Sequence, residues 1–361
     1  MEKSNWSCAA IDHGVTVFPH GKIGPCCRIS ADYLKPLSEL SNPARFADLK
    51  TAEPPAACQS CVADEYRHIP SYRTMFNSLK TSAPGLQFVD IRNTNLCNLK
   101  CRYCGPHFSS SWARELGRTI PIVTTHIDHN QLITDSLHWM YFTGGEPLIN
   151  GEHWELLEQL IETNQAQRIA LVYNSNLTTL RYKDRNITDI WAHFKRVEIK
   201  CSIDAVGSTF EYIRSGAEWA RVSANIDELL KLPVSISLTP VISLLNIWNI
   251  GELCDYAKHK KIRIDPTVLV GPDYLALDVI PDQLKAQAIT AALPLKAHIH
   301  SSTYNHIINL INHNQNQYLF KHTVAHVLLL DNRRGERLFD LLPFGELAQQ
   351  QLLENHEYES K

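Results

Sequence analysis

Residues 86–105 read Leu-Gln-Phe-Val-Asp-Ile-Arg-Asn-Thr-Asn-Leu-Cys-Asn-Leu-Lys-Cys-Arg-Tyr-Cys-Gly, an apolar run followed by a polar loop with three cysteines. The run is short and contains β-branched and aromatic side chains, which is typical of a buried strand. Six runs of this kind occur: Leu86–Arg92, Trp139–Thr143, Arg168–Tyr173, Val197–Ser202, Val234–Thr239 and Ile262–Val270. Segments of helical length separate them, for example Gly151–Asn164, Asn225–Leu232 and Asn246–Lys260.

This alternation predicts six successive βα units. They imply an α/β chain with a parallel sheet and right-handed crossovers, either an open doubly wound sheet or a partial (β/α) barrel. Asn150 and Asn246 stand where they could cap two of the helices. After Pro281 the apolar residues recur at helical spacing, which predicts a helical C-terminal extension. The apolar positions are Leu284, Ala288, Ile289 and Ala292.

The composition excludes several classes of protein. In 361 residues, 44% are hydrophobic, and 35 basic against 38 acidic side chains leave a net charge of −3. This balance argues against a nucleic-acid binder, which would carry a basic face or tail. No apolar stretch is long enough for a membrane span, and the first residues lack the basic start and apolar run of a secretory signal. We therefore expect a soluble cytoplasmic protein of two or three domains.

Polar and glycine-rich segments follow the predicted strands directly. They are Asn95–Cys104, Gly144–Pro147, Asn174–Asn176, Ser202 with Asp204, and Pro240. In parallel α/β folds, binding and catalytic groups gather at the carboxyl ends of the strands. The sequence therefore places its unusual chemistry along one rim. Taken singly, the third to fifth segments are equally compatible with ordinary βα turns rich in Gly, Asn and Asp.

The first rim loop spaces its cysteines as C-x3-C-x2-C, at Cys97, Cys101 and Cys104. In a reducing cytosol such thiols favour metal or cluster ligation over disulfides. Three thiolates can hold three irons of a 4Fe–4S cluster and leave the fourth iron open, as in a catalytic metal site. A zinc knuckle that borrows His107, or three unligated thiols, are the alternatives.

This loop resembles the cluster motif of the radical S-adenosylmethionine (SAM) enzymes, C-x3-C-x-Φ-C, with Tyr103 at the aromatic position. Thr143–Pro147 resembles the G-G-E-P motif of the same family, whose Gly144, Gly145 and Glu146 would contact the SAM amino group. The resemblance implies a partial (β/α)6 barrel and an enzyme fed by an electron donor such as flavodoxin or ferredoxin. Such an enzyme cleaves SAM to methionine and a 5′-deoxyadenosyl radical, which abstracts hydrogen from a substrate.

Four further residues carry over from the same resemblance as SAM contacts. Asn174 and Asn176 stand where relatives contact ribose, and Ser202 lies in a Ser-Ile-Asp segment that helps to hold SAM. Arg214 falls where relatives carry an arginine able to pair with the SAM carboxylate. Surface or turn roles are the alternatives for each, and the sequence singles out no catalytic acid, base or hydrogen donor.

The first eighty residues hold a second cysteine group. Cys8 and Cys26 in C-x12-G-x4-C spacing, followed by Cys58 and Cys61, resemble the auxiliary-cluster pattern of SPASM and twitch domains. Those domains usually follow the barrel, whereas this pattern precedes it. The resemblance implies a second 4Fe–4S cluster on these four thiols, with Cys27 a spare neighbour or a substitute for Cys26. A zinc ribbon-like site is the alternative.

These observations predict three parts: an auxiliary cluster domain at residues 1–83, a radical SAM barrel at 84–270 and a helical extension at 271–361. Because many relatives with auxiliary domains modify peptides, we expect a peptide or protein side chain as the substrate. A small molecule of cofactor biosynthesis is the alternative substrate. A non-catalytic iron–sulfur or zinc protein is the alternative outside the enzyme class. We expect neither nucleic acid nor membrane as a partner.

Overall fold

The computed structural model describes residues 6–67, 69–117 and 122–337. A nine-stranded sheet has the order β12-β10-β9-β6-β5-β4-β1-β2-β3. Its first six strands are parallel and adjacent in chain order, as six consecutive βα units require. They are β4 (Phe88–Ile91), β5 (Trp139–Phe142), β6 (Ala170–Ser175), β9 (Arg196–Cys201), β10 (Ser235–Leu238) and β12 (Arg263–Ile264). The expected partial barrel is confirmed.

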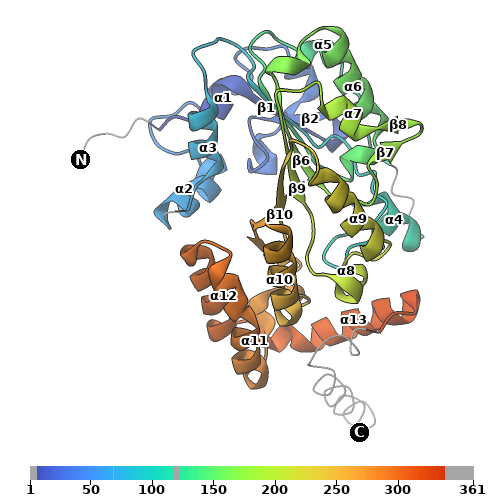
Figure 1. Ribbon diagram of the computed structural model, residues 1–361. Coiled ribbons are helices and arrows are strands. Elements are labelled where there is room, and N and C mark those ends of the chain that lie inside the picture. The colour runs from blue at the N-terminus through green and yellow to red at the C-terminus, as the bar shows by residue number, and fades with distance from the viewer. Residues whose placement is uncertain (1–5, 68, 118–121, 338–361) are drawn as a thin grey trace.

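The crossover helices pack on one face of this sheet. Figure 1 shows α6, α7 and α9 on one side of the strands and α1, α2 and α3 on the other. The crossover segments contain α4 (Ser110–Glu115), α5 (His129–Leu132), α6 (Gly151–Glu162), α7 (Ile187–Trp191), α8 (Gly207–Ile213), α9 (Trp219–Leu229) and α10 (Ile250–Lys260). Strand residues such as Met140, Leu171 and Ile199 are fully buried in the main core with these helices.

The two expected helix caps have different outcomes. Asn150 does cap α6, because its Oδ1 accepts a hydrogen bond from the Glu152 amide at 3.3 Å. Asn246 makes no such bond to its helix. Its side-chain amide instead donates to the carbonyls of Asp204 and Val241, both at 3.0 Å, so this expectation was wrong. The residue ties two rim loops together.

The N-terminal segment adds three strands to the same sheet. β1 (Gly14–Phe18) pairs in parallel with β4, and β2 (Lys22–Gly24) and β3 (Lys35–Pro36) continue antiparallel. The helices α1 (Ala9–His13), α2 (Gln59–Tyr66) and α3 (Tyr72–Leu79) belong to this segment. α1 and α3 contribute to a second buried cluster with Phe88, Trp139 and Tyr141 of the sheet. Around β4 and β5 the concave face of the barrel is therefore covered by residues that precede it in the chain.

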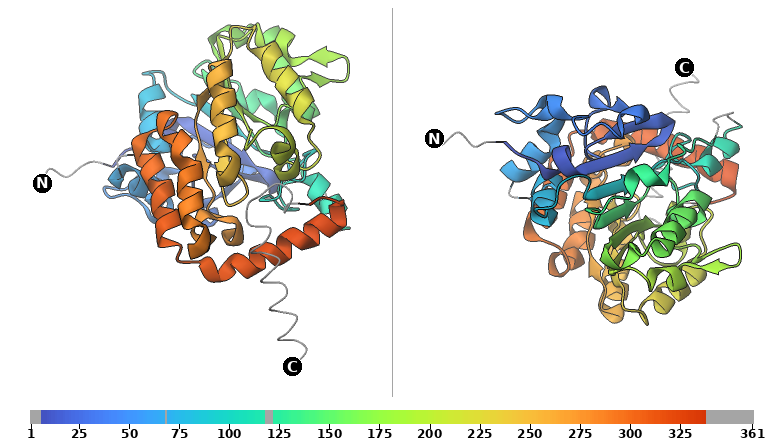
Figure 2. Two further views of the ribbon diagram at one scale, coloured as in Figure 1. Left: turned by 60° about the horizontal axis from the view of Figure 1, so that its bottom comes forward. Right: turned by 90° about the horizontal axis from the view of Figure 1, so that it is seen from above.

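The remaining elements include the C-terminal helices α11 (Lys285–Ala292), α12 (Ser301–His313) and α13 (Phe320–Arg334). Ala288 and Ala292 are fully buried, as the apolar spacing predicts. In Figure 2 (left), α13 crosses one end of the molecule. Two small pairs complete the structure: β7 (Arg181–Tyr182) with β8 (Arg185–Asn186), and β11 (Val241–Ile242) with β13 (Thr267–Val268). Within the described ranges, no helix has both the length and the apolar character needed to cross a membrane.

Candidate active site at the carboxyl ends of the strands

The backbone of the cysteine loop after β4 is held in place by hydrogen bonds from nearby side chains. The indole of Trp112 donates to the Cys101 carbonyl at 2.8 Å, and the hydroxyls of Ser110 and Ser111 donate to the Cys97 carbonyl. Burial raises the pKa of the Cys97 thiol to about 11 and that of Cys101 to about 12. Each thiol also lies close enough to the others to disfavour a second thiolate. The thiols of this loop therefore stay protonated until a metal cation binds to them and displaces the protons.

An arginine stands directly beside this loop. Arg214 has its Nη1 atom 3.8 Å from the Cys101 sulfur and its Nε atom 2.8 Å from Asp204 Oδ2. Asp204, which is fully buried, also accepts from the Tyr103 hydroxyl at 2.7 Å and from the Val241 amide at 2.8 Å. Tyr103 and Asp204 therefore position the arginine against the thiols. Asp204 was not among the predicted site residues, although its place after the fourth strand was a signal.

The glycines of the second rim loop make room for the cysteine loop. A Cβ atom on Gly145 would lie 2.0 Å from the Leu96 carbonyl oxygen, and Gly144 has a φ of +106°. The amide of Gly145 donates to the Thr94 carbonyl at 3.0 Å, and the amide of Glu146 donates to that of Leu96 at 2.8 Å. Glycine is required here because the two backbones touch. The structure shows this close approach between the two loops, and the contact of Gly144 and Gly145 with a ligand stays a prediction.

The Glu146 carboxylate links the second rim loop to the third. Oε1 accepts from the Leu148 amide at 3.1 Å and from the Ser175 hydroxyl at 2.8 Å, and Oε2 accepts from the Asn176 amide at 2.7 Å. Burial raises the pKa of this carboxyl group, against the effect of these three hydrogen bonds. A ligand ammonium would have to share oxygens that the protein already uses. Ser175 was another residue that the sequence did not single out.

The three polar residues expected at the third and fourth strands differ in what they bind. The Asn176 side chain is hydrogen-bonded within the protein: its Nδ2 donates to Asn98 Oδ1 at 3.0 Å, and its Oδ1 accepts from the Thr178 amide at 3.0 Å. Asn174 has a buried Oδ1 without a hydrogen-bond partner in the described part of the chain. Ser202 is half-buried at the end of β9, with its amide bonded to the Ser175 carbonyl. The Asn174 oxygen can thus accept a hydrogen bond from a ligand.

The N-terminal cysteines form a separate group. Cys8, Cys26, Cys58 and Cys61 line one small pocket, together with apolar and aromatic side chains, Arg28 and Arg73. Burial raises the pKa of the Cys8 thiol, and it raises that of Cys58 to about 11. The structure therefore brings together the four cysteines that the spacing selects.

The neighbouring thiol of Cys27 does not line this pocket. It lies near Tyr72 and the Asp90–Arg92 ion pair, on the concave side of the sheet. The thiols of Cys26 and Cys27 thus lie in different surroundings, whereas the sequence left open which of the two is the ligand. Within the described ranges, no group of three or more His, Cys, Asp and Glu side chains is arranged to hold a single metal ion.

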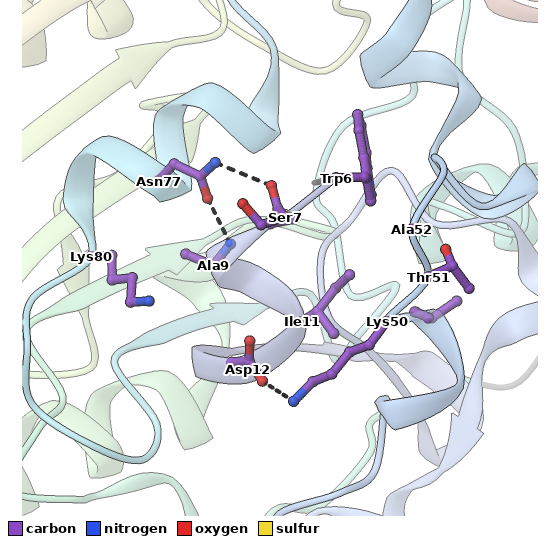
Figure 3. A pocket seen from close by; sticks show the side chains of 12 residues that line it. Trp6, Ser7, Ala9, Ile11, Asp12, Lys50, Thr51, Ala52, Asn77 and Lys80 are labelled. Atoms are coloured by element: carbon purple, nitrogen blue, oxygen red, sulfur yellow. Dashed lines mark hydrogen bonds and ion pairs between the residues drawn. The ribbon is translucent and has the colours of Figure 1, made fainter. Parts of the chain in front are cut away.

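A second pocket, shown in Figure 3, is lined by Cys8 among other residues and has a volume of about 360 Å³. Asn77 bridges its wall: its Oδ1 accepts from the Ala9 amide at 2.7 Å, and its Nδ2 donates to the Ser7 carbonyl at 3.2 Å. Asp12 and Lys50 form an ion pair on the opposite side. These contacts fix the start of α1 and hence the position of Cys8.

The central part of the chain matches the model of a known protein family. Residues 91–257 match the family model of the radical SAM superfamily. The chain carries a radical SAM domain. Members of this superfamily use a 4Fe–4S cluster and SAM and need an electron donor, and the three rim thiols with their buried arginine suit such a cluster.

The curated relatives match about half of the chain. Molybdenum cofactor biosynthesis protein 1 of Dictyostelium discoideum is 29% identical over 177 residues, covering 47% of this chain and 26% of the relative. The GTP 3′,8-cyclase of Clostridium acetobutylicum is 27% identical over 183 residues, covering 50% and 55%. The chain thus spans between a quarter and about half of the length of these relatives.

Solved structures show more distant likenesses. Native anSMEcpe with bound AdoMet has a TM-score of 0.41 at 17% identity, covering 56% of this chain and 58% of that one. Streptococcus suis SuiB bound to S-adenosylmethionine has a TM-score of 0.39 at 16% identity, covering 58% and 48%.

Proposed function

We propose that Cys97, Cys101 and Cys104 hold a 4Fe–4S cluster with one iron left for SAM. The observation that carries this proposal is the arrangement of three thiols in one loop, Cys101 buried and Cys97 and Cys104 half-buried, with backbone hydrogen bonds from that loop to the glycine-rich loop. Held by these three thiolates, the cluster would pass an electron from an external donor to bound SAM, and so supply the reductive cleavage of SAM that starts hydrogen abstraction from the substrate.

The residues of this chain would orient the cofactor. Arg214 is fixed by Asp204 beside Cys101, where its charge offsets that of the thiolates and can attract the SAM carboxylate. Glu146 fixes the second rim loop, so that the carbonyl groups of Gly144 and Gly145 remain at a constant place for the SAM ammonium.

The substrate we infer is a small molecule of cofactor biosynthesis. The curated relatives carry the names GTP 3′,8-cyclase and molybdenum cofactor biosynthesis protein 1, which favours this alternative over the expected peptide. Because identity is at most 29% and covers about half of the chain, the relatives support the class of substrate and not its identity.

The N-terminal pocket is our proposed site of a second 4Fe–4S cluster, bound by Cys8, Cys26, Cys58 and Cys61. Four thiols around one small apolar pocket support it. Ligation by four cysteines leaves no iron open, so this cluster would transfer electrons or brace the concave face. The reducing electron would come from a protein such as flavodoxin or ferredoxin.

The test is anaerobic reconstitution of the full chain with iron and sulfide, followed by dithionite and SAM. Wild-type protein should release 5′-deoxyadenosine, Cys101→Ala should not, and Cys201→Ala, a buried cysteine in β9, should behave as wild type. Iron analysis should give about eight irons per chain, and about four would refute the second cluster. Protein that holds only zinc, or Cys101→Ala that still cleaves SAM, would refute the proposed function.

A further inference from the structure

Three neighbouring strands present a row of polar side chains below the rim. Asn174 of β6, Lys200 of β9 and Ser237 of β10 are register partners across the ladder, so their side chains point to the same face of the sheet. The alternate residues Tyr173 and Cys201 point to the opposite face, into the main core with the crossover helices. The row therefore lies on the concave face.

The polar atoms of this row lack partners within the described part of the chain. Ser237 is 1% exposed, and its hydroxyl oxygen has no hydrogen bond; the same is true of the buried Asn174 Oδ1. Buried polar groups are nearly always bonded, and leaving one unbonded is costly. Two such atoms on either side of one lysine indicate that the partner is a ligand.

Lys200 between them is a cation without an acidic partner in the described ranges. Its ammonium lies 6.0 Å from the centre of the Tyr141 ring, which confirms that it faces the concave side. Glu198 shares its strand and face but is paired with Arg196 at 2.8 Å and Arg263 at 3.3 Å. The positive charge of Lys200 is therefore available.

We propose that Lys200, Ser237 and Asn174 bind an anionic group, a phosphate or a carboxylate, of the substrate. The lysine supplies the charge, and the hydroxyl and the amide supply hydrogen bonds, since an amide can turn either its oxygen or its nitrogen to the ligand. Ser202 follows directly after β9, two residues beyond Lys200 and nearer to the rim. An anion bound at Lys200 thus leaves the rest of the molecule extending towards the rim loops. This inference rests on the proposed function for the identity of the bound molecule as a substrate.

The test is calorimetric titration of the reconstituted full chain, saturated with SAM, with tripolyphosphate, succinate and guanosine. We expect one of the two anions to bind and guanosine alone not to bind, and the better anion identifies phosphate or carboxylate as the group. Lys200→Met should weaken binding about tenfold or more. Lys195→Met, an exposed lysine just before the same strand, is the matched control and should bind as wild type.

Ser237→Ala is the variant that separates binding from folding. Because the hydroxyl has no partner within the protein, its loss should leave the melting temperature unchanged or raise it while weakening anion binding several-fold. The proposal is overturned if neither anion binds, if saturating SAM abolishes binding, or if Lys200→Met and Ser237→Ala bind as tightly as Lys195→Met. Release of 5′-deoxyadenosine without substrate, measured on the same samples, shows independently whether the proposed function stands.

Discussion

Arg102, within the cysteine loop, is 2% exposed and connects that loop to the C-terminal helix α13. Its Nη2 atom lies 2.7 Å from Asp331 and also contacts Glu336, and its Nε donates to the Tyr212 carbonyl at 3.1 Å. The Tyr212 hydroxyl donates to the same Asp331 oxygen at 2.9 Å. Figure 1 shows how far α13 extends from α11 to reach this position.

Arg102→Met should therefore destabilise the protein strongly. The variant removes the cationic half of the buried Arg102–Asp331 ion pair, and breaking a buried pair in this way costs about 3–5 kcal/mol. At about 2–4 °C per kcal/mol, the melting temperature of the apoprotein should fall by on the order of 10 °C. Iron retention should fall as well, because Arg102 lies between Cys101 and Tyr103.

Thermal and denaturant unfolding of the apoprotein measure this effect, with Arg333→Met on the same helix as the control. Arg333 is exposed, so its variant should stay within about 0.5 kcal/mol of wild type. The double variant Arg102→Met, Asp331→Asn should recover part of the loss, since it also removes the carboxylate that Arg102 neutralises. A loss below about 1 kcal/mol in Arg102→Met would refute the reasoning, because it would mean that solvent or another group already neutralises Asp331.

Two further predictions concern the second rim loop and the core. Gly145→Ala should displace the cysteine loop, because the new Cβ would lie 2.0 Å from the Leu96 oxygen. The iron content per chain should therefore drop. The control Gly105→Ala should keep its iron, because a Cβ at Gly105 would meet no atom within 4 Å. Equal iron in both variants would contradict this. Burial lowers the pKa of His153 to about 3, so the unfolded chain binds more protons and stability should fall as pH drops below about 6.5. At about 1.4 kcal/mol per pKa unit the loss at pH 5 is about 2 kcal/mol, measured by denaturant unfolding at pH 7 and 5. In His153→Gln, which can still bond to Tyr173, this pH dependence should shrink, and an unchanged slope would rule out the assignment.

The parallel core of the fold could be predicted because its signals are local. Each of the six strands lies in a short apolar run, and three of the helices between them, α6, α9 and α10, are long enough to show a helical pattern. The edge of the sheet could not be predicted. β3 is only Lys35–Pro36, and β1 finds its partner β4 about seventy residues later, so neither has a pattern that reveals its pairing. The run Ile262–Val270 was also expected as one strand, whereas the structure divides it between two sheets.

In the candidate site, the spacing of residues in the sequence identified the groups that lie within one loop. It missed the residues that contact the site from distant parts of the chain. The cysteines 97, 101 and 104 and the glycine-rich loop are contiguous motifs. Asp204 and Ser175 act on residues far away in the chain, Arg214 and Glu146, and no spacing rule links them. Similarly, Cys26 and Cys27 are adjacent in sequence, and only the course of the chain after β2 decides which thiol faces the pocket.

The pairing of β1 with β4 has a consequence for shortened forms of the protein. A chain that starts at residue 84 would keep the radical SAM motifs but lose the neighbour of β4, whose amide and carbonyl groups would then form an exposed edge. Phe88, Trp139 and Tyr141 would lose their apolar cover at the same time. Bare strands of this kind pair with other copies and aggregate. The segment before residue 84 thus protects the barrel from self-association, whatever metal its cysteines bind.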